Sequence, residues 1–490
     1  MPFATLPRLK ENNEYGDPTI SEGRVCPQLR DRKRLRKELE GFLTSERVLS
    51  HTKIPAKFRF DALRPYRPYP RLRKAGYVPT ILVRPETDAE VSHVVRVARR
   101  YHCPVVPYGG GTGLMGAAIA ASGGIMVDTS KMNRIEEISR EDMMLKAQPG
   151  VVLEEAYARL DQEQLLFAHD PWTRPVATIG GAISTNSLGY IGGKYGSIGT
   201  QLLGVEAVLP NADLLKTRPA QFSSTGFDLR QLFIGTEGLF GIVTTAIVRA
   251  FPKPETMKVV SYGFSEFEKA HRAINLMRSN DVRPSMIDYG EEPDSRGESQ
   301  LNLAFDGLEK EVLAQAEKAE RVISECSGNK LNDADAREFW DHRHDIALMY
   351  SRRVSNALPE EEPRTKYDYV HVSLPASKIL GFRTELLRMA REGGVNVLEV
   401  GLWQGPELLS LVLSSRAADP KTATRKLWRV SNLIIRYAQD LGGAMEFCHG
   451  VGMKLSHMMA REHGVGLEVM RQLKRTIDPL GIMNPGKESL

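Results

Sequence analysis

The alternation of hydrophobic and polar positions divides this chain into segments with different periods. Between residues 76 and 253, short apolar runs such as "ILV" and "PVVPY" alternate with segments in which apolar residues recur every three or four positions. The short runs predict strands, and the spacing in "ETDAEVSHVVRVARRY" predicts an amphipathic helix that begins near Thr87 or Asp88. We therefore expect one α+β domain in this part of the chain.

Residues 254–450 show a different order of elements. Strand-like and helix-like segments follow one another as two successive β-α-β-β-α sets, separated by the polar segment 337–366. The helix-like segments cover 266–279, 308–326, 376–391 and 419–440. Such sets predict a ferredoxin-like antiparallel sheet with helices on one face. The separating segment is a candidate functional insertion, because long insertions in compact domains often carry function.

The remaining segments flank these two domains. Residues 1–75 are rich in Arg and Pro and have little periodicity, which predicts an N-terminal arm with a short helix at 32–43. Residues 451–490 form a C-terminal segment that ends in a helix and "IDPLGIMNPGK". The expected division of the chain is thus 1–75, 76–253, 254–450 and 451–490.

The composition excludes several classes of protein. The chain has 490 residues, 41% hydrophobic and 26% charged, with a net charge of +5, which is ordinary for a soluble globular protein. The basic cluster at 30–37 lacks a nucleic-acid-binding motif or aromatic platform, so we expect no nucleic-acid partner. No apolar run has the length of a membrane span, and the N-terminus lacks the form of a signal peptide. With four scattered cysteines, these features favour a cytoplasmic protein that is not an integral membrane protein.

The segment "PYGGGTGLMG" (107–116) is the most unusual short stretch of the chain. Glycine lets backbone N–H groups approach a phosphate, because no Cβ stands in the way. Gly111, Gly113 and Gly116 spell G-x-G-x-x-G, but only "AAIAASGG" separates them from the next apolar run. A nicotinamide-binding Rossmann site needs a helix there, so we expect a phosphate-binding loop in a different fold.

Six further segments accompany this loop in a recognisable order. They are "DP" (170–171), "RPVATIGGAISTN" (174–186), "KYG" (194–196), "STGFDLRQLFIGTEGLFGIVT" (224–244), "HGVG" (449–452) and "DPLGIMNPGK" (478–487). Together the seven segments resemble the FAD-linked oxidoreductases of the vanillyl-alcohol oxidase type. The most similar branch contains the D-2-hydroxyacid dehydrogenases, the catalytic subunit of glycolate oxidase and alkylglycerone-phosphate synthase. The resemblance spans roughly residues 75–490, and it implies a PCMH-type FAD-binding domain (76–253), a substrate or cap domain (254–450) and a C-terminal return to the flavin (451–490).

The resemblance also implies which residues hold FAD. The glycine loop would wrap the pyrophosphate, so a side chain added at Gly111 would occupy the place of the pyrophosphate. The implied FAD-binding residues are Pro107, Tyr108, Gly109, Gly110, Gly111, Thr112, Gly113, Asp170, Pro171, Thr178, Ile179, Gly180, Gly181, Ser184, Asn186, Tyr195, Gly196, Glu237, Gly238, Gly241, Ile242, Val243 and Asn484. The glycine loop contains no His or Cys, which are the usual attachment residues there, so we expect the FAD to be noncovalent.

The implied reaction is hydride transfer from an alcohol to flavin N5, with a protein base that removes the hydroxyl proton. Histidine suits that role near neutral pH, and His449 of "HGVG" is the first candidate base. Arg343 and Lys366 match family positions that contact a substrate carboxylate, which an arginine binds well. The further candidates for the pocket are His371, Tyr350 and Glu399.

The chain departs from the 2-hydroxyacid dehydrogenases at their metal site. That branch carries a "GHxGDGNLH" hairpin and a Glu before "HG", whose two histidines and carboxylate bind a divalent ion. Here Leu402, Leu409 and Cys448 occupy those positions. Apolar side chains do not ligate a metal, so we expect an enzyme without a metal site.

Several functions remain open at this point. The first is a dehydrogenase or oxidase of a small-molecule alcohol or 2-hydroxy acid, or of a neutral aromatic or sugar alcohol with Trp403 and Tyr350 shaping the pocket. The second is a redox-neutral enzyme like alkylglycerone-phosphate synthase, and the third is a non-catalytic FAD-binding subunit. The electron acceptor (oxygen, a quinone or an electron-transfer protein) stays open, and the sequence is compatible with a homo-oligomer.

Overall fold

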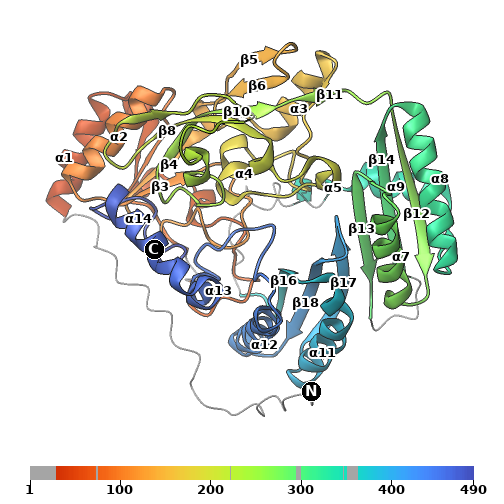
Figure 1. Cartoon of the computed structure of the whole chain (residues 1–490). Helices are drawn as coiled ribbons and strands as arrows, with labels where there is room; N and C mark the ends of the chain where they lie inside the picture. The colour runs from red at the N-terminus through yellow and green to blue at the C-terminus, as the bar shows by residue number, and fades with distance from the viewer. Residues whose placement is uncertain (1–28, 73–75, 221, 294–298, 346, 350–361) are drawn as a thin grey trace.

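The computed structural model describes residues 29–72, 76–220, 222–293, 299–345, 347–349 and 362–490. These residues form a mixed α+β fold with two sheets in the N-terminal half and a large antiparallel sheet in the C-terminal half (Figure 1). The predicted fold class is confirmed.

The first sheet is mainly parallel and carries the glycine loop. Its strands, in spatial order, are β1 (Val48–Ser50), β2 (Ile81–Val83), β4 (Ile125–Asp128) and β3 (Val105–Tyr108), with only β1 antiparallel to its neighbour. Helix α2 (Asp88–Arg100) begins at its N-cap Thr87, whose Oγ1 accepts the N–H of Glu90 at 3.2 Å, as the sequence predicts. No helix follows β3, which agrees with the prediction of a fold other than the Rossmann fold.

The part of the N-terminal segment that the structure describes is not a peripheral arm. Helix α1 (Leu29–Glu40) buries Leu35 and Leu39 in the same core as Val95 of α2 and Val105 of β3. Strand β1 then adds to the edge of the first sheet. From Leu29 onward, the segment expected as an arm therefore belongs to the N-terminal domain.

The second sheet is antiparallel and stands behind the flavin-binding segments predicted from the sequence. Its strands, in spatial order, are β5 (Ile135–Ser139), β6 (Met144–Ala147), β10 (Ile242–Arg249), β8 (Leu202–Val208) and β9 (Leu214–Lys216). Its connections contain α3 (Leu153–Gln162), α4 (Ile179–Thr185), α5 (Gly192–Tyr195) and α6 (Ile198–Gln201), and β7 (Leu165–Leu166) pairs with β11 (Phe251–Pro252). Ile179, Ala182 and Ile183 of α4 pack into the core of this sheet, which fixes the helix beside the glycine loop.

The third sheet is formed by the two predicted β-α-β-β-α sets. The first set is β12 (Thr256–Phe264), α7 (Phe267–Ser279), β13 (Met286–Glu291), β14 (Ser299–Gly307) and α8 (Glu309–Glu325). The second set is β16 (Thr365–Ser373), α11 (Ile379–Glu392), β17 (Asn396–Trp403), β18 (Leu408–Arg416) and α12 (Pro420–Asp440). Strands β13 and β17 join the sets, and β15 (Asn329–Lys330) completes a seven-stranded antiparallel sheet.

The two faces of this sheet have different partners. Alternate strand residues, such as Val260 and Ile287, form one core with the apolar faces of α7, α8, α11 and α12. The strand residues that point to the opposite face, such as Met286 and Trp403, pack against Tyr190 of the N-terminal domain and Trp340 of α9 (Asp333–His342). The face without the four helices is therefore directed toward the N-terminal domain.

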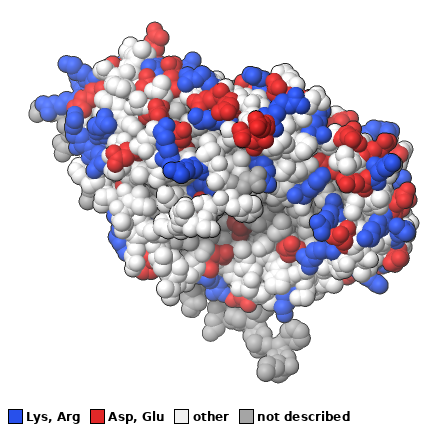
Figure 2. All heavy atoms as spheres, turned by 45° about the horizontal axis from the view of Figure 1, so that its top comes forward, with Lys and Arg blue, Asp and Glu red and all other residues white. Residues whose placement is uncertain are grey.

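The C-terminal segment returns to the first sheet. After α13 (Met459–His463) and α14 (Val465–Ile477), Asn484 donates its backbone N–H to Val105 of β3 at 2.8 Å. Among the helices that the structure describes, none combines the length and the apolar composition that a membrane span requires. On the face shown in Figure 2, basic and acidic side chains are intermixed, so that face presents no extended area of one charge.

Candidate functional site

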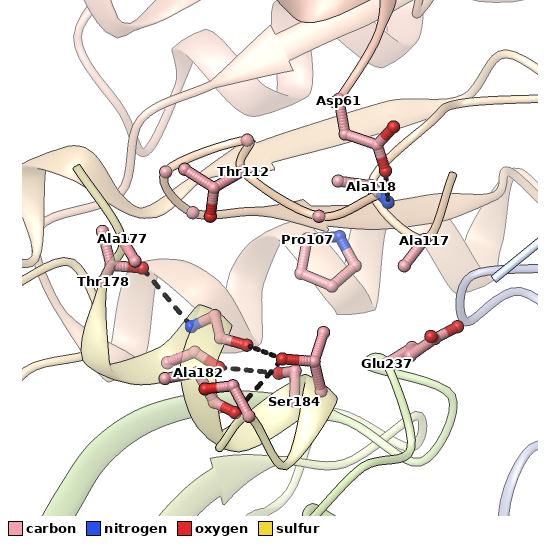
Figure 3. A pocket seen from close by; sticks show the side chains of 18 of the residues that line it. Asp61, Pro107, Thr112, Ala117, Ala118, Ala177, Thr178, Ala182, Ser184 and Glu237 are labelled. Carbon is pink, nitrogen blue, oxygen red and sulfur yellow. Dashed lines mark hydrogen bonds between the residues drawn. The ribbon is translucent and has the colours of Figure 1, made fainter. Parts of the chain in front are cut away.

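A cavity lies between the glycine loop after β3 and helix α4 (Figure 3). The loop residues 109–113 line one wall, and Thr178, Gly181 and Ser184 line the wall opposite. Thr178 is the N-cap of α4, and its Oγ1 accepts the N–H of Gly181 at 3.3 Å. Both walls therefore expose backbone at the cavity surface, because glycine occupies the positions where a side chain would cover it.

Two glycines of the loop have no room for a larger residue. A Cβ added to Gly109 would lie 2.5 Å from the Thr178 Oγ1, so the loop approaches α4 closely only without a side chain there. Gly111 has a φ of +66°, and its Cβ would collide with the Tyr108 hydroxyl. An added side chain at Gly111 would thus meet Tyr108, a collision that the sequence did not predict, and its overlap with the pyrophosphate stays a prediction.

Most of the residues predicted to hold FAD line this single cavity, although they come from three distant parts of the sequence. They are Pro107, Tyr108, Gly109, Gly110, Gly111, Thr112, Gly113, Pro171, Thr178, Gly180, Gly181, Ser184, Glu237, Gly238, Gly241, Ile242 and Val243. A glycine-lined cradle with backbone N–H groups fits a dinucleotide phosphate. The residues present are therefore compatible with FAD.

Three other predicted FAD residues have structural partners instead. Asn186 is the left-handed C-cap of α4, with a φ of +49°, and its Oδ1 accepts the N–H of Gly199 at 3.2 Å. Tyr195 donates its hydroxyl to Asp306 of β14 at 2.6 Å and thereby links the two domains. Asn484 donates its amide to the carbonyl oxygens of Ala117 and Glu237, both of which line the cavity. Asn484 supports the cavity wall but does not line it.

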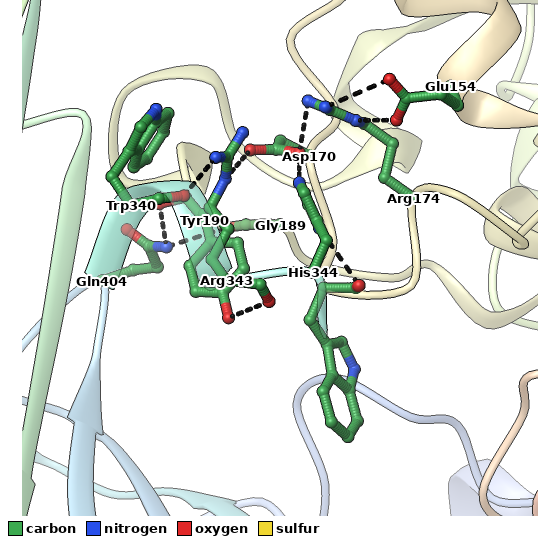
Figure 4. A network of polar contacts seen from close by, with 10 residues as sticks. Glu154, Asp170, Arg174, Gly189, Tyr190, Trp340, Arg343, His344 and Gln404 are labelled. Carbon is green, nitrogen blue, oxygen red and sulfur yellow. Dashed lines mark hydrogen bonds and ion pairs between the residues drawn. The ribbon is translucent and has the colours of Figure 1, made fainter. Parts of the chain in front are cut away.

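The remaining three lie behind the wall. Ile179 is fully buried in the core of the second sheet, and Gly196 forms the turn after α5 with a φ of +75°. Asp170 does not line the cavity, and its carboxylate faces Arg174 and Arg343 (Figure 4). These three residues shape the site from outside.

Asp170 neutralises one of the predicted substrate-binding residues. Its carboxylate contacts Arg174 at 2.8 Å, the Arg343 Nε at 3.0 Å and the His344 Nε2 at 3.1 Å (Figure 4). Burial raises the pKa of Asp170, but the hydrogen bond from His344 and the charges of Arg343 and Arg174 lower it by a larger amount, so that the resulting pKa is about 2. Arg343 also stacks on Trp340 and is only 9% exposed. The structure therefore gives Arg343 a structural partner rather than a place in the cavity.

Lys366 is also absent from the cavity, and strand alternation explains why. Lys366 and Asp368 are fully buried on the helix-covered face of β16, where Lys366 binds Glu362 and the carbonyl of Pro65. Thr365, Tyr367 and Tyr369 point to the opposite face. Two of the other candidates, Glu399 and Trp403, line neither this cavity nor a second cavity that adjoins it. Tyr350 lies outside the described residues.

His449 does line the cavity, and it belongs to a cluster that brings together distant residues. The His449 ring lies 4.4 Å, between centroids, from the ring of His371 on β16. The His449 Nδ1 is 3.6 Å from the Glu446 Oε1, which also accepts the backbone N–H groups of residues 447–449. Neither histidine Nδ1 has a hydrogen-bond partner in the described part of the chain. These are residue types that can also ligate a metal, and their ligand atoms lie within 4.8 Å of one another.

The cluster sets opposite charge states for the two histidines. Burial lowers the pKa of His449, but the neighbouring Cys448 and Glu446 raise it by more, to about 10. Burial and the charge of His449 lower the pKa of His371 to about 3. At neutral pH, His449 is therefore the protonated partner, and His371 is neutral.

Glu237 connects this cluster to the FAD cavity. Its carboxylate accepts the backbone N–H groups of Val451 and Gly452, both at 2.9 Å, and so holds the "HGVG" turn against the cavity wall. Burial raises the pKa of Glu237 to about 7, and that of the cavity-lining Asp61 to about 6. Sequence reasoning named Glu237 but missed Asp61, which lies in the segment taken for an arm.

A second cavity adjoins the first and shares Thr112, Leu114, Trp172 and Thr173 with it. Its volume is about 620 Å³, and Tyr66, Arg67 and Tyr369 contribute to its wall. No residue of this cavity was named from the sequence except Thr112 of the glycine loop. Its position next to the FAD cavity makes it the candidate substrate cavity.

Two family descriptions match the chain in the order of its domains. Residues 79–218 match the FAD binding domain, and residues 253–488 match the C-terminal domain of FAD linked oxidases. The glycolate oxidase subunit GlcD of Bacillus subtilis is 28% identical over 426 residues, covering 84% of this chain and 89% of that protein. The mitochondrial D-lactate dehydrogenase [cytochrome] of Arabidopsis thaliana is 25% identical over 438 residues, covering 86% and 75%.

Solved structures agree with the fold. The structure of p-cresol methylhydroxylase with substrate bound has a TM-score of 0.77 at 17% identity, covering 94% of this chain and 98% of that one. An alkyldihydroxyacetonephosphate synthase has a TM-score of 0.75 at 19% identity, covering 94% and 86%. With both domains matched in sequence and fold, and with the predicted segments gathered around one glycine-lined cavity, the chain belongs to the FAD-linked oxidoreductases that combine a PCMH-type FAD-binding domain with a FAD-linked oxidase C-terminal domain.

Proposed function

We propose that this FAD-linked oxidoreductase oxidises the CH–OH group of an alcohol or hydroxy acid, with noncovalent FAD and with His449 as the proton acceptor. The observation that carries the proposal is the position of His449, which lines the FAD cavity and contacts both His371 and Glu446. The names of the relatives, a glycolate oxidase subunit and D-lactate dehydrogenases, support this class of substrate.

Each residue of the cluster has a distinct role in the proposed reaction. Bound FAD supplies the hydride acceptor, and the protein must remove the hydroxyl proton. His449 accepts that proton in its neutral form. Glu446 positions His449, because its carboxylate holds the backbone of residues 447–449 and attracts the imidazolium. His371 limits the charge of the cluster, because a second imidazolium beside His449 is unfavourable.

The anaerobic reaction with substrate tests this function directly. The purified protein should lose its flavin absorbance when an oxidisable alcohol or hydroxy acid is added without oxygen, over a screen of hydroxy acids, aromatic alcohols and sugars. A redox-neutral synthase or a non-catalytic FAD subunit would keep its flavin oxidised with every compound. The same bleaching should survive exhaustive chelation, because Glu446 already accepts three backbone N–H groups and contacts the protonated His449. A loss of bleaching on chelation, restored by a divalent ion, would instead make the His371, Glu446 and His449 cluster a metal site.

The pH dependence of flavin reduction should reveal His449. Its neutral form is the base, and its pKa is raised to about 10, so the rate should increase with pH through the neutral range and level off near pH 10. Glu446→Gln keeps an oxygen that accepts the backbone N–H groups but removes the negative charge. The pKa of His449 should then fall, and the pH profile should move to lower pH. Rapid-mixing absorbance at several pH values measures this.

A rate of flavin reduction that changes with pH in the opposite direction would assign His449 a different role. If the protonated His449 instead stabilises the substrate oxygen, the rate should be highest below pH 10, and Glu446→Gln should lower it at neutral pH. Glu385→Gln, on α11, is a matched control because, among the described residues, the Glu385 carboxylate forms an ion pair with Arg388 alone. That variant should leave the profile unchanged.

Acid precipitation should release the flavin into the supernatant. The glycine loop offers no His or Cys, but Cys448 and His449 line the same cavity, so the composition of the loop alone does not decide the attachment. We expect noncovalent FAD, which a colourless protein pellet after acid precipitation would show. A yellow pellet would contradict the proposal, and its loss in Cys448→Ser or His449→Ala would identify the attachment residue.

A further inference from the structure

The second cavity contains a buried guanidinium group that the fold itself leaves without a hydrogen-bond partner. Arg67 is 2% exposed, and within the described residues its Nε, Nη1 and Nη2 all lack a hydrogen-bond partner. Buried polar groups without partners are rare in native proteins, and a buried charge is unfavourable unless it is paired. Arg67 is in the wall of a cavity of about 620 Å³, but its nitrogens have less than 1 Å² of accessible surface each. A ligand in that cavity supplies the missing acceptors once the side chain turns toward the cavity.

The charge around Arg67 is only partly compensated. The Arg67 Nη2 lies 3.1 Å from the Asp368 Oδ1, which is an ion pair without the alignment of a hydrogen bond. The same carboxylate oxygen accepts a hydrogen bond from the Lys454 Nζ at 2.6 Å, and the other accepts one from the Ser431 hydroxyl at 2.8 Å. One buried carboxylate thus faces two cations, so the positive charge of the guanidinium is only partly offset, and a bound anion would complete the compensation.

The mouth of the cavity carries the same sign of charge. Arg364 and Arg416 line it, and the pairing of Thr365 with Arg416 places both arginines at the same end of the β16–β18 ladder. Among the residues that the structure describes, neither arginine has an acidic partner, and no Asp or Glu lines the cavity. A negatively charged ligand would therefore be attracted into this cavity.

The rest of the wall is aromatic and apolar. Trp172 and Tyr369 pack edge to face at 6.4 Å between centroids, and the Arg67 guanidinium carbon lies 4.9 Å from the centre of the Tyr369 ring. Leu114 and Met349 add apolar surface. A cavity of this size and composition suits an organic molecule with a ring or an extended apolar body.

We propose that the second cavity binds the body of an anionic substrate, an alcohol with an aromatic or extended apolar skeleton whose carboxylate or phosphate group is held by the Arg67 guanidinium. This inference rests on the proposed function only in that the bound anion is called a substrate. The anion site itself follows from Arg67, the two arginines at the mouth and the shared wall of Trp172 and Thr173 that joins the cavity to the FAD cavity.

Binding to the oxidised holoenzyme tests the site without turnover. The probes are benzoate, cinnamate and phenyl phosphate, with benzyl alcohol as the neutral analogue, and calorimetry measures each affinity while absorbance follows the flavin. The wild type should bind the anions and discriminate against benzyl alcohol. The preference between cinnamate and phenyl phosphate shows whether the group is a carboxylate or a phosphate.

Substitutions should assign the binding to Arg67. Arg67→Met should weaken the anions by at least about 30-fold, the lower range for loss of a buried ion-pair partner, and should leave benzyl alcohol unchanged. Arg67→Lys should retain part of the affinity, because a lysine keeps the charge but not the fork. Arg416→Met tests the mouth if the Arg67 variants fail to fold, and it should also weaken the anions selectively. Arg283→Met is the matched control, because Arg283 is an exposed arginine that pairs with Asp281 and lines neither cavity.

The outcomes separate this site from the proposed function. Equal binding of anions and benzyl alcohol by the wild type would overturn the anion site, as would equal losses for both kinds of probe in Arg67→Met and Arg416→Met. Selective anion binding without any flavin bleaching would keep the anion site and overturn the oxidation of a CH–OH group. Bleaching by neutral alcohols alone, with no binding of the anionic probes, would keep the oxidation and overturn the anion site.

Discussion

Replacing His449 by alanine should slow flavin reduction by roughly 10²–10⁴-fold, the usual contribution of a general base, while FAD stays bound. The slow step should be proton removal, because no other titratable side-chain nitrogen lines the FAD cavity among the described residues. FAD should stay bound because Glu237 holds the turn through Val451 and Gly452, not through the side chain of His449. Anaerobic rapid mixing at the pH of the highest wild-type rate measures the effect.

A second histidine provides the control for this substitution. His271 lies on α7, contacts Asn275 and lines neither cavity, so His271→Ala should leave the rate of flavin reduction unchanged. An unchanged rate in His449→Ala would assign the proton to His371 or to another group, and His371→Asn would then be the variant that slows the reaction.

The features that local chemistry determines were predictable from the sequence. Helix α2 shows its apolar stripe and its N-cap within one short segment. Each β-α-β-β-α set of the large sheet repeats the same order of strand-like and helix-like spacing of apolar residues. The glycine loop was predictable for this reason only in part. At Gly111 the requirement for a small residue arises locally, from a φ of +66° and from Tyr108, whereas at Gly109 it arises from contact with the distant Thr178. The resemblance to a family added the order in which such segments occur.

The N-terminal segment shows where local reasoning fails. Arg67 and Asp61 lie in a stretch rich in Arg and Pro, and that composition is typical of an exposed arm. Both residues are nonetheless buried, because the segment packs between the glycine loop and the edge of β16, where Tyr367 donates its N–H to Tyr66 at 2.9 Å. Such burial arises from contacts between residues about 300 positions apart, which hydrophobic periodicity does not report.

Neither residue of the predicted carboxylate clamp lines the two cavities, for two separate physical reasons. Lys366 has the right charge but lies on the wrong face of the sheet. Adjacent residues of a strand face opposite sides, and Tyr369 faces the cavity instead. Arg343 and Asp170 were predicted as parts of different sites, yet they bind each other at 3.0 Å. Sequence reasoning named Arg343 and Asp170 but did not give their pairing. The pairing of His371 with Glu446 and His449 was missed for the same reason.

Gly111→Val should yield protein that is purified mostly without FAD. A valine at a φ of +66° is unfavourable by about 1–2 kcal/mol, and its Cβ would in addition collide with the Tyr108 hydroxyl, so the loop must move. Because the adjacent Gly110 also lies directly against the backbone of Val176, the loop has little room to shift without changing the cavity. The ratio of flavin to protein absorbance measures FAD content.

Gly442→Val separates loss of the cradle from a general effect of strain. Gly442 follows α12 with a φ of +81°, but nothing lies within 4 Å of its added Cβ and it lines neither cavity. This variant should bear the same kind of backbone strain and still contain FAD. Full FAD content in folded Gly111→Val would contradict the position of the cofactor, because the loop would then have moved without consequence for binding. Loss of FAD in both variants would mean that strain anywhere in the chain releases the cofactor, and selective loss in Gly111→Val would assign the phosphate cradle to residues 109–113.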